Sequence, residues 1–153
     1  MARKEITYTI SDEGRDKGKK FLITEMSARK AEEFALRAFS SAVACGIKND
    51  NTDASQGMLA LAKIGYALIV TMPYEYSQPL LDQLMSCVKI QEQHITRDVL
   101  EVDVEEVATY LKLKKAAYDL HVSFFTDGGL STSGSDQSAR KENTLTIKPR
   151  PTR

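Results

Sequence analysis

The stretch Gly14-Arg15-Asp16-Lys17-Gly18-Lys19-Lys20-Phe21-Leu22-Ile23-Thr24-Glu25-Met26-Ser27, which continues through an alanine-rich segment to Phe39, decides the fold. Phe21–Glu25 has the apolar and β-branched content of a strand, and Ser27 is a residue type that caps helix N-termini. Upstream, Glu5–Ile10 alternates apolar and polar residues with a period of two. The two apolar segments therefore predict an antiparallel hairpin across a charged turn, followed at once by a helix.

Four helices are expected after the strands. The first covers about 28–45, with one apolar stripe at helical spacing and Gly46 as its C-terminal cap. The second, about 54–71, is apolar nearly all round, which indicates a central position or a covering partner. Pro73 should end it.

The third helix is expected to start at Ser77, with Pro79 in its first turn, and to run through Val88. Residues 91–102 could form a short strand or an irregular return. Asp103 and Glu106 have the spacing of a capping box for a fourth helix that ends near Phe125.

The composition is that of one ordinary globular domain. Of 153 residues, 42% are hydrophobic, and Lys plus Arg equals Asp plus Glu at 21 each, so no global field favours nucleic acid or an anionic membrane. We expect an α+β domain over 1–127, with an N-terminal β-hairpin packed on about four helices. Residues 128–153 are expected to form a flexible polar and basic tail, because they are rich in Ser, Thr and Gly.

The sequence offers no set of catalytic, cofactor-binding or metal-binding residues. His94 and His121 lie in different elements, and Asp119, two residues before His121 on the expected helix, does not face it. Cys45 and Cys87 are expected to be reduced, buried residues on the apolar faces of helices. No apolar leader follows Arg3, and no apolar run reaches the length of a membrane span, so we expect a cytoplasmic protein without a membrane partner.

The end of the fourth helix is the expected contact site for another protein. Aromatic residues gather where order should give way to the tail, and aromatics are enriched in interface hot spots. The candidate protein-binding residues are Tyr118, His121, Phe124 and Phe125. The lysines at 112, 114 and 115 and the basic tail are interpreted as solvated surface, with no specific nucleic-acid partner.

The order of these segments resembles the bacteriophage tail assembly chaperones. Four motifs over roughly residues 4–125 carry the resemblance: Gly14 to Met26; Ala31-Glu32 through Leu36-Arg37-Ala38; Gln78-Pro79-Leu80-Leu81-Asp82 through Cys87-Val88; and Val104-Glu105-Glu106-Val107 through Leu111-Lys112-Leu113 to Leu120-His121 and Phe124-Phe125.

The resemblance implies a protein without enzymatic activity, made in the cytoplasm of an infected bacterium. It would coat the helical tape-measure protein and recruit the major tail protein. A helix that is apolar all round suits binding an amphipathic helix or a second copy of the chain. The alternative, from another class, is a structural virion protein, such as a minor tail or connector subunit that stays in the particle. A small enzyme is a third reading, and it would need a pocket that joins a histidine to a carboxylate.

Overall fold

The first two strands form the expected hairpin. The structure, a computed structural model, describes residues 3–46 and 65–126. β1 (Glu5–Thr9) pairs antiparallel with β2 (Lys20–Thr24), and Tyr8 lies opposite Phe21. This antiparallel pairing confirms the predicted hairpin. The alternation with a period of two places the apolar side chains of β1 on one face of the sheet.

Two further strands extend the hairpin to a sheet. β3 (Val88–Glu92) pairs with β2, and β4 (Ile95–Asp98) pairs with β3, so the order is β1-β2-β3-β4 and all pairs are antiparallel. Residues 91–102, for which the sequence allowed either a short strand or an irregular return, thus contain the end of β3 and all of β4. The expectation that Val88 continues a helix is wrong, because it starts β3 and faces the core.

The turn between β3 and β4 places a non-glycine residue in the left-handed region. Gln93 has φ of 48° and, with His94, forms the two-residue connection. Two-residue hairpin loops need positive φ to match the strand twist, and glycine reaches that region at least cost. Gln93 is therefore a strained position.

The first helix has the predicted ends. α1 (Ala28–Ala44) begins after Ser27, whose hydroxyl accepts a hydrogen bond from the Lys30 backbone N–H at 3.4 Å. Gly46 has φ of 81° and donates from its N–H to the Val43 carbonyl. Glycine suits this position at the C-terminal end of α1 because a side chain disfavours positive φ.

The next two helices differ from their predicted bounds. α3 (Tyr66–Thr71) begins after Gly65, whose φ of 83° and ψ of 162° are not helical, so a helix running unbroken through this position is wrong. Residues 54–64 of that expected helix lie outside the described residues. The helix ends before Pro73, as expected.

α4 (Tyr74–Met85) begins directly after Pro73, three residues before the expected start at Ser77. Both Tyr76 and Ser77 donate their backbone N–H to the Pro73 carbonyl, which closes the first turn. Pro79 consequently lies inside the helix and not in its first turn.

The last helix starts later than predicted. η2 (Glu101–Asp103) is a single 3-10 turn, and α5 (Val107–Thr126) follows it. The expected capping box at Asp103 therefore does not open α5. The end near Phe125 is confirmed.

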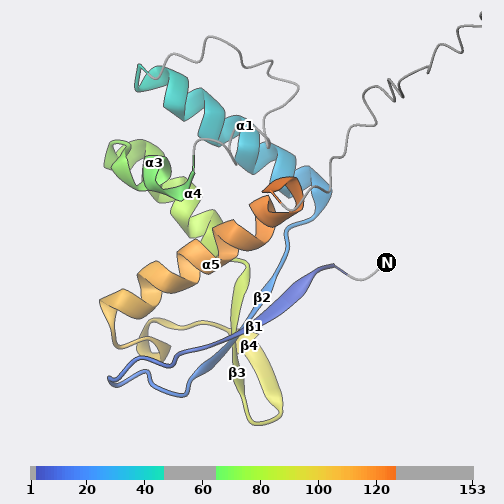
Figure 1. Cartoon of the computed structure of the whole chain (residues 1–153), viewed down its shortest axis with the longest axis vertical. Coiled ribbons are helices and arrows are strands. Elements are labelled where there is room, and N and C mark those ends of the chain that lie inside the picture. The colour runs from blue at the N-terminus through green and yellow to red at the C-terminus, as the bar shows by residue number, and fades with distance from the viewer. Residues whose placement is uncertain (1–2, 47–64, 127–153) are drawn as a thin grey trace, which may run out of the picture.

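α5 covers one face of the sheet and the other helices stack beyond it, which gives the expected α+β fold. α5 contacts β1 and β2, α4 packs on α5, and α1 packs on α4, with the helices drawn above the strands in Figure 1. The fully buried large apolar side chains come from both layers: Phe21, Ile23, Ile90, Phe34, Ile69, Leu80, Leu84 and Leu113. Residues 128–153, the expected tail, lie outside the described residues.

The two cysteines are free, and their positions differ. Cys87 lies just after α4 and is 9% exposed, and burial raises the pKa of its thiol. Cys45 ends α1 and is half-buried, so its expected burial is wrong. Cys87 is buried as expected, but it lies beyond the end of α4 and not on a helix face.

Candidate functional site

The start of α5 is fixed to the sheet by one buried carboxylate. Asp16, in the β1–β2 loop, is 1% exposed. Its oxygens accept hydrogen bonds from the backbone N–H groups of Glu105 (3.0 Å) and Glu106 (2.8 Å), and from the Lys19 ammonium (2.7 Å). Glu106 is the residue just before α5, and its N–H has no partner within the helix, while the Glu105 N–H precedes it. Asp16 therefore caps the entry to α5 from a distant loop.

The environment of Asp16 keeps it ionised. Burial alone would raise its pKa, but the hydrogen bonds from Lys19, Glu105 and Glu106 outweigh burial and hold the pKa well below its ordinary value. The negative charge also complements the positive end of the α5 dipole. Figure 1 shows the β1–β2 loop beside the start of α5.

Further contacts strengthen this junction. Arg15 donates to the Glu106 carboxylate (3.0 Å) and to the Glu105 carbonyl (2.9 Å), and Lys19 also donates to the Asp103 carbonyl (2.9 Å). The charged turn predicted from the sequence is therefore a structural junction, and its acidic residue is buried.

Asp103 holds the segment that precedes α5. Its carboxylate pairs with the Arg97 guanidinium at 2.6 and 2.8 Å and accepts the Leu100 backbone N–H at 2.6 Å. The Arg97 hydrogen bond is the main reason that the pKa of Asp103 falls to about 2. Asp103 therefore caps η2, and Asp16 takes the role at α5 that the sequence assigned to Asp103.

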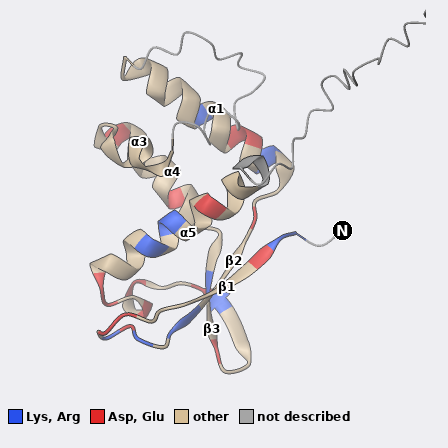
Figure 2. Cartoon of the chain, viewed as in Figure 1, with Lys and Arg blue, Asp and Glu red and all other residues tan. Residues whose placement is uncertain are grey.

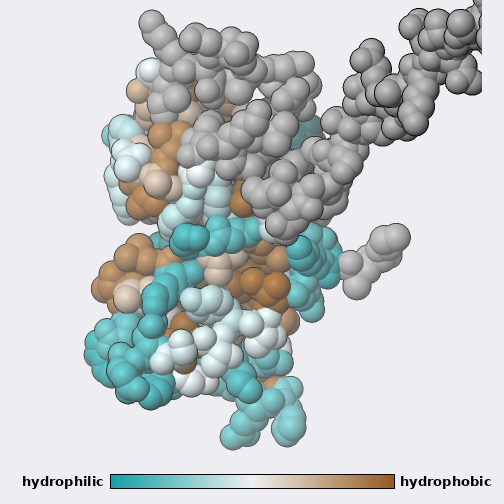
Figure 3. All heavy atoms as spheres, viewed as in Figure 1, coloured by the Kyte–Doolittle hydropathy of each residue, from teal (hydrophilic) through white to brown (hydrophobic). Residues whose placement is uncertain are grey.

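Next to this junction lies an exposed apolar surface. Leu100 and Val102 are 56% and 78% exposed, and Val107 and Leu111 are 76% and 50% exposed. We call these four residues the η2–α5 surface. Figure 3 shows hydrophobic residues gathered over the first turns of α5. Val107 and Leu111 are one helical turn apart and share a face, as an apolar partner helix requires.

Charged residues of both signs border the η2–α5 surface. Figure 2 shows lysines along the middle of α5 and acidic residues at the loops near its start. Lys112 forms an ion pair with Asp12, and Lys114 lies over the Tyr110 ring at 5.8 Å. An apolar centre with a charged rim is the arrangement of protein–protein interfaces.

Two of the predicted binding residues lie in the interior. Tyr118 is 3% exposed, its ring centroid is 5.6 Å from that of Tyr66, and burial raises its pKa to about 12. His121 is 9% exposed. A partner cannot reach either side chain in this structure, because the inner face of α5 packs on its neighbours. The Phe124 and Phe125 side chains lie outside the part that the structure describes.

His121 joins two elements as a neutral ring. Its Nε2 accepts the Met26 backbone N–H at 2.8 Å, and its Nδ1 lies 2.6 Å from the Ala117 carbonyl, to which it donates. Desolvation lowers its pKa. The ring thereby connects α5 to the segment between β2 and α1, which is a structural role.

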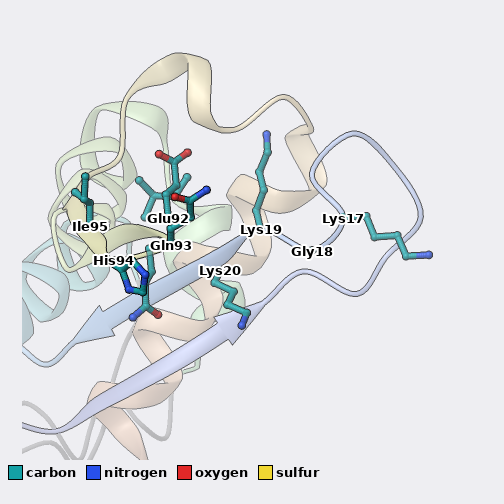
Figure 4. Close-up of a pocket in the computed structure, with 10 residues that line it drawn as sticks. Lys17, Gly18, Lys19, Lys20, Glu92, Gln93, His94 and Ile95 are labelled. Carbon is teal, nitrogen blue, oxygen red and sulfur yellow. The ribbon is translucent and has the colours of Figure 1, made fainter.

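A groove between the β1–β2 loop and the β3–β4 turn is the other hollow of note. It has a volume of about 1000 Å³, and Lys17, Lys19, Lys20 and His94 are among its lining residues. Figure 4 shows the three lysines pointing in different directions, Lys19 toward the segment before α5. Lys17 pairs with Glu13, and Lys19 with Asp16. The side chains do not converge on one ligand, so the groove does not have the form of an anion site.

The described ranges 3–46 and 65–126 contain no group of three or more His, Cys, Asp or Glu side chains arranged to hold a metal ion. Among the helices described there, none has both the length and the hydrophobicity to cross a membrane. Comparison of the chain with family models, with curated proteins and with solved structures finds no match. The η2–α5 surface is therefore the strongest candidate site, and it fits protein binding.

Proposed function

We propose that this chain is a tail assembly chaperone of a tailed bacteriophage, acting without enzymatic activity in the cytoplasm of the infected host. Four motifs in the order found in that family support the proposal. The single structural observation that supports it most is the η2–α5 surface, with Val102 and Val107 more than three-quarters exposed.

The proposed partner is the tape-measure protein, whose long helices present apolar stripes. A helix with residues at i and i+4 can place them against Val107 and Leu111 in the helix-in-groove mode. Phe124 and Phe125 are proposed to extend this contact, and the major tail protein is the second proposed partner. The hydrogen bonds of Asp16 to Glu105 and Glu106 favour binding. They fix the start of α5 in the free protein, so no conformational entropy is lost there when the partner binds.

Co-expression with the tape-measure protein of the same phage tests the proposal. The full chain should raise the soluble yield of that protein and co-purify with it. Val107→Asp should abolish co-purification. The variant should fold normally, since an acidic residue in the first turn of a helix suits the dipole.

Leu36→Asp is the matched control. Leu36 is 45% exposed on α1, which packs on α4 and α3, so this variant should still co-purify. Both variants should keep the circular dichroism of the unmodified chain. A tape-measure protein that is no more soluble with this chain than without it contradicts the proposal. Stoichiometric copies of the chain in mature tails would favour the structural virion protein instead.

A further inference from the structure

The outer edge of β1 presents a row of backbone groups. Glu25 donates its N–H to the Lys4 carbonyl (2.9 Å), and Ile10 donates to the Lys19 carbonyl (3.0 Å). Hydrogen-bonded positions alternate along an antiparallel pair, so the even-numbered residues of β1 face β2 with their backbone groups. The odd-numbered residues, Glu5, Thr7 and Thr9, direct their N–H and C=O groups to the other side. Within residues 3–46 and 65–126, no backbone hydrogen bond joins this outer row.

The opposite edge of the sheet is better protected. β4 has four residues, and its second half is the charged pair Arg97 and Asp98. Short, charged edge strands resist pairing with another chain. β1 has five residues, and Glu5 is its single charged one. Because Thr7 and Thr9 are exposed and have high strand propensity, β1 is the edge that is open to a further strand.

We propose that β1 pairs antiparallel with β1 of a second copy of this chain, about a two-fold axis at Thr7. This register places Thr7 opposite its own copy and Glu5 opposite Thr9 of the second copy. Each of these pairs exchanges two backbone hydrogen bonds. The two sheets become one, and both α5 helices lie on the same face of it.

Charge favours the antiparallel orientation of the two strands. Arg3 and Lys4 precede β1, whereas Asp12 and Glu13 follow it. Antiparallel pairing sets the basic end of one strand beside the acidic end of the other. These groups are exposed, so they orient the copies more than they stabilise them.

Axes at Glu5 and at Thr9 bring like charges together. An axis at Glu5 would place that carboxylate opposite itself, and an axis at Thr9 would place Glu5 opposite Glu13. The axis at Thr7 avoids both pairs. An axis at Tyr8 would set Arg3 opposite Glu13 and Lys4 opposite Asp12, but Asp12 and Glu13 already form ion pairs with Lys112 and Lys17 of their own copy. On the face that α5 covers, the axis at Thr7 also brings Ile6 beside Tyr8 of the second copy, which is a favourable aromatic and β-branched pair.

The inference follows from the sheet edge and does not rest on the tail-assembly role.

Sedimentation equilibrium of the full chain over a concentration series tests the proposal. The mass should rise toward twice the 17.0 kDa of the chain at sub-millimolar concentration. Thr7→Pro should keep the mass of one chain throughout, because proline removes an outward N–H that the single copy does not use. Thr96→Pro, which removes an outward N–H at the β4 edge, is the matched control and should still dimerise.

Disulfide trapping gives a second readout, which decides the matter if Thr7→Pro fails to fold. In a Cys45→Ser background, Thr7→Cys should cross-link two copies under mild oxidation. Residues facing each other in a hydrogen-bonded pair have Cα atoms about 5.5 Å apart, within disulfide range. Thr96→Cys should not cross-link. A chain that stays monomeric, a dimer that survives Thr7→Pro, or equal cross-linking at both edges would overturn the proposal.

Discussion

Replacing Asp16 with alanine should destabilise the fold more than any other single change in the charged turn. Asp16→Ala removes the acceptor for the backbone N–H groups of Glu105 and Glu106. Loss of a helix cap costs about 1 kcal/mol. Buried N–H groups left without an acceptor cost about 1–3 kcal/mol more. We therefore expect a loss of roughly 3 kcal/mol in the free energy of unfolding.

Urea denaturation followed by circular dichroism measures this loss. With a slope of about 1–3 kcal/mol per molar, the midpoint should fall by about 1–3 M. Asp12→Ala is the control: it removes an exposed ion pair with Lys112, and such pairs contribute about 0–1 kcal/mol. If Asp16→Ala lowered the midpoint no further than Asp12→Ala does, the capping role would be refuted.

A second variant, Asp16→Asn, tests how the contribution of the Asp16 carboxylate to stability depends on pH. The pKa of Asp16 is lower in the folded state than in the unfolded chain, so its contribution is complete above the unfolded pKa of about 3.9. The contribution is lost as the pH falls from there through the folded pKa. The difference in stability between the unmodified chain and Asp16→Asn should consequently shrink below about pH 4.

Four further outcomes follow from the structure. The free energy of unfolding should fall as the pH drops below about 6.5, because His121 becomes protonated in the unfolded chain while the buried ring resists protonation. In urea titrations at several pH values, His121→Gln should make the free energy of unfolding less dependent on pH. Gln93→Gly should raise the thermal midpoint, with a gain of about 0.5–1 kcal/mol from relieved strain at positive φ, and a lower midpoint would contradict the strain. Without denaturant, a thiol reagent should label Cys45 well before Cys87; equal rates would argue against the burial of Cys87. A chain ending at Gly129 should keep the full-length midpoint, and a loss of several degrees would contradict the domain limit at 127.

The parts of the fold that local sequence determines were predictable. The alternation in β1 and the Ser27 cap of α1 depend on residues within one element, and both are confirmed. The role of Asp16 was not predictable in this way, since its amide partners lie 89 and 90 residues further along the chain. A charged residue between two glycines has the composition of a solvated turn, and only the folded chain reveals that it is buried.

The candidate surface left a signal in the sequence that was not used. At 3.6 residues per turn, Val107 and Leu111 lie about a third of a turn away from the stripe of Leu113, Ala117 and Leu120. Two apolar stripes on one helix cannot both face the same core, so one of them had to be exposed. The aromatic end of α5 was chosen instead. Tyr118 and His121 from that set lie in the interior, because large side chains on the inner face of a helix fill the core.

The hydrogen bonds between Asp16 and the residues before α5 also have a consequence for folding during synthesis at the ribosome. The N-terminal hairpin emerges first, but the amides that satisfy its buried carboxylate are made some ninety residues later. Until they appear, the hairpin must keep Asp16 in water and its apolar face uncovered. The domain therefore cannot complete its fold until nearly the whole described chain has been synthesised. An interrupted translation product would expose apolar surface and be an early target for proteolysis.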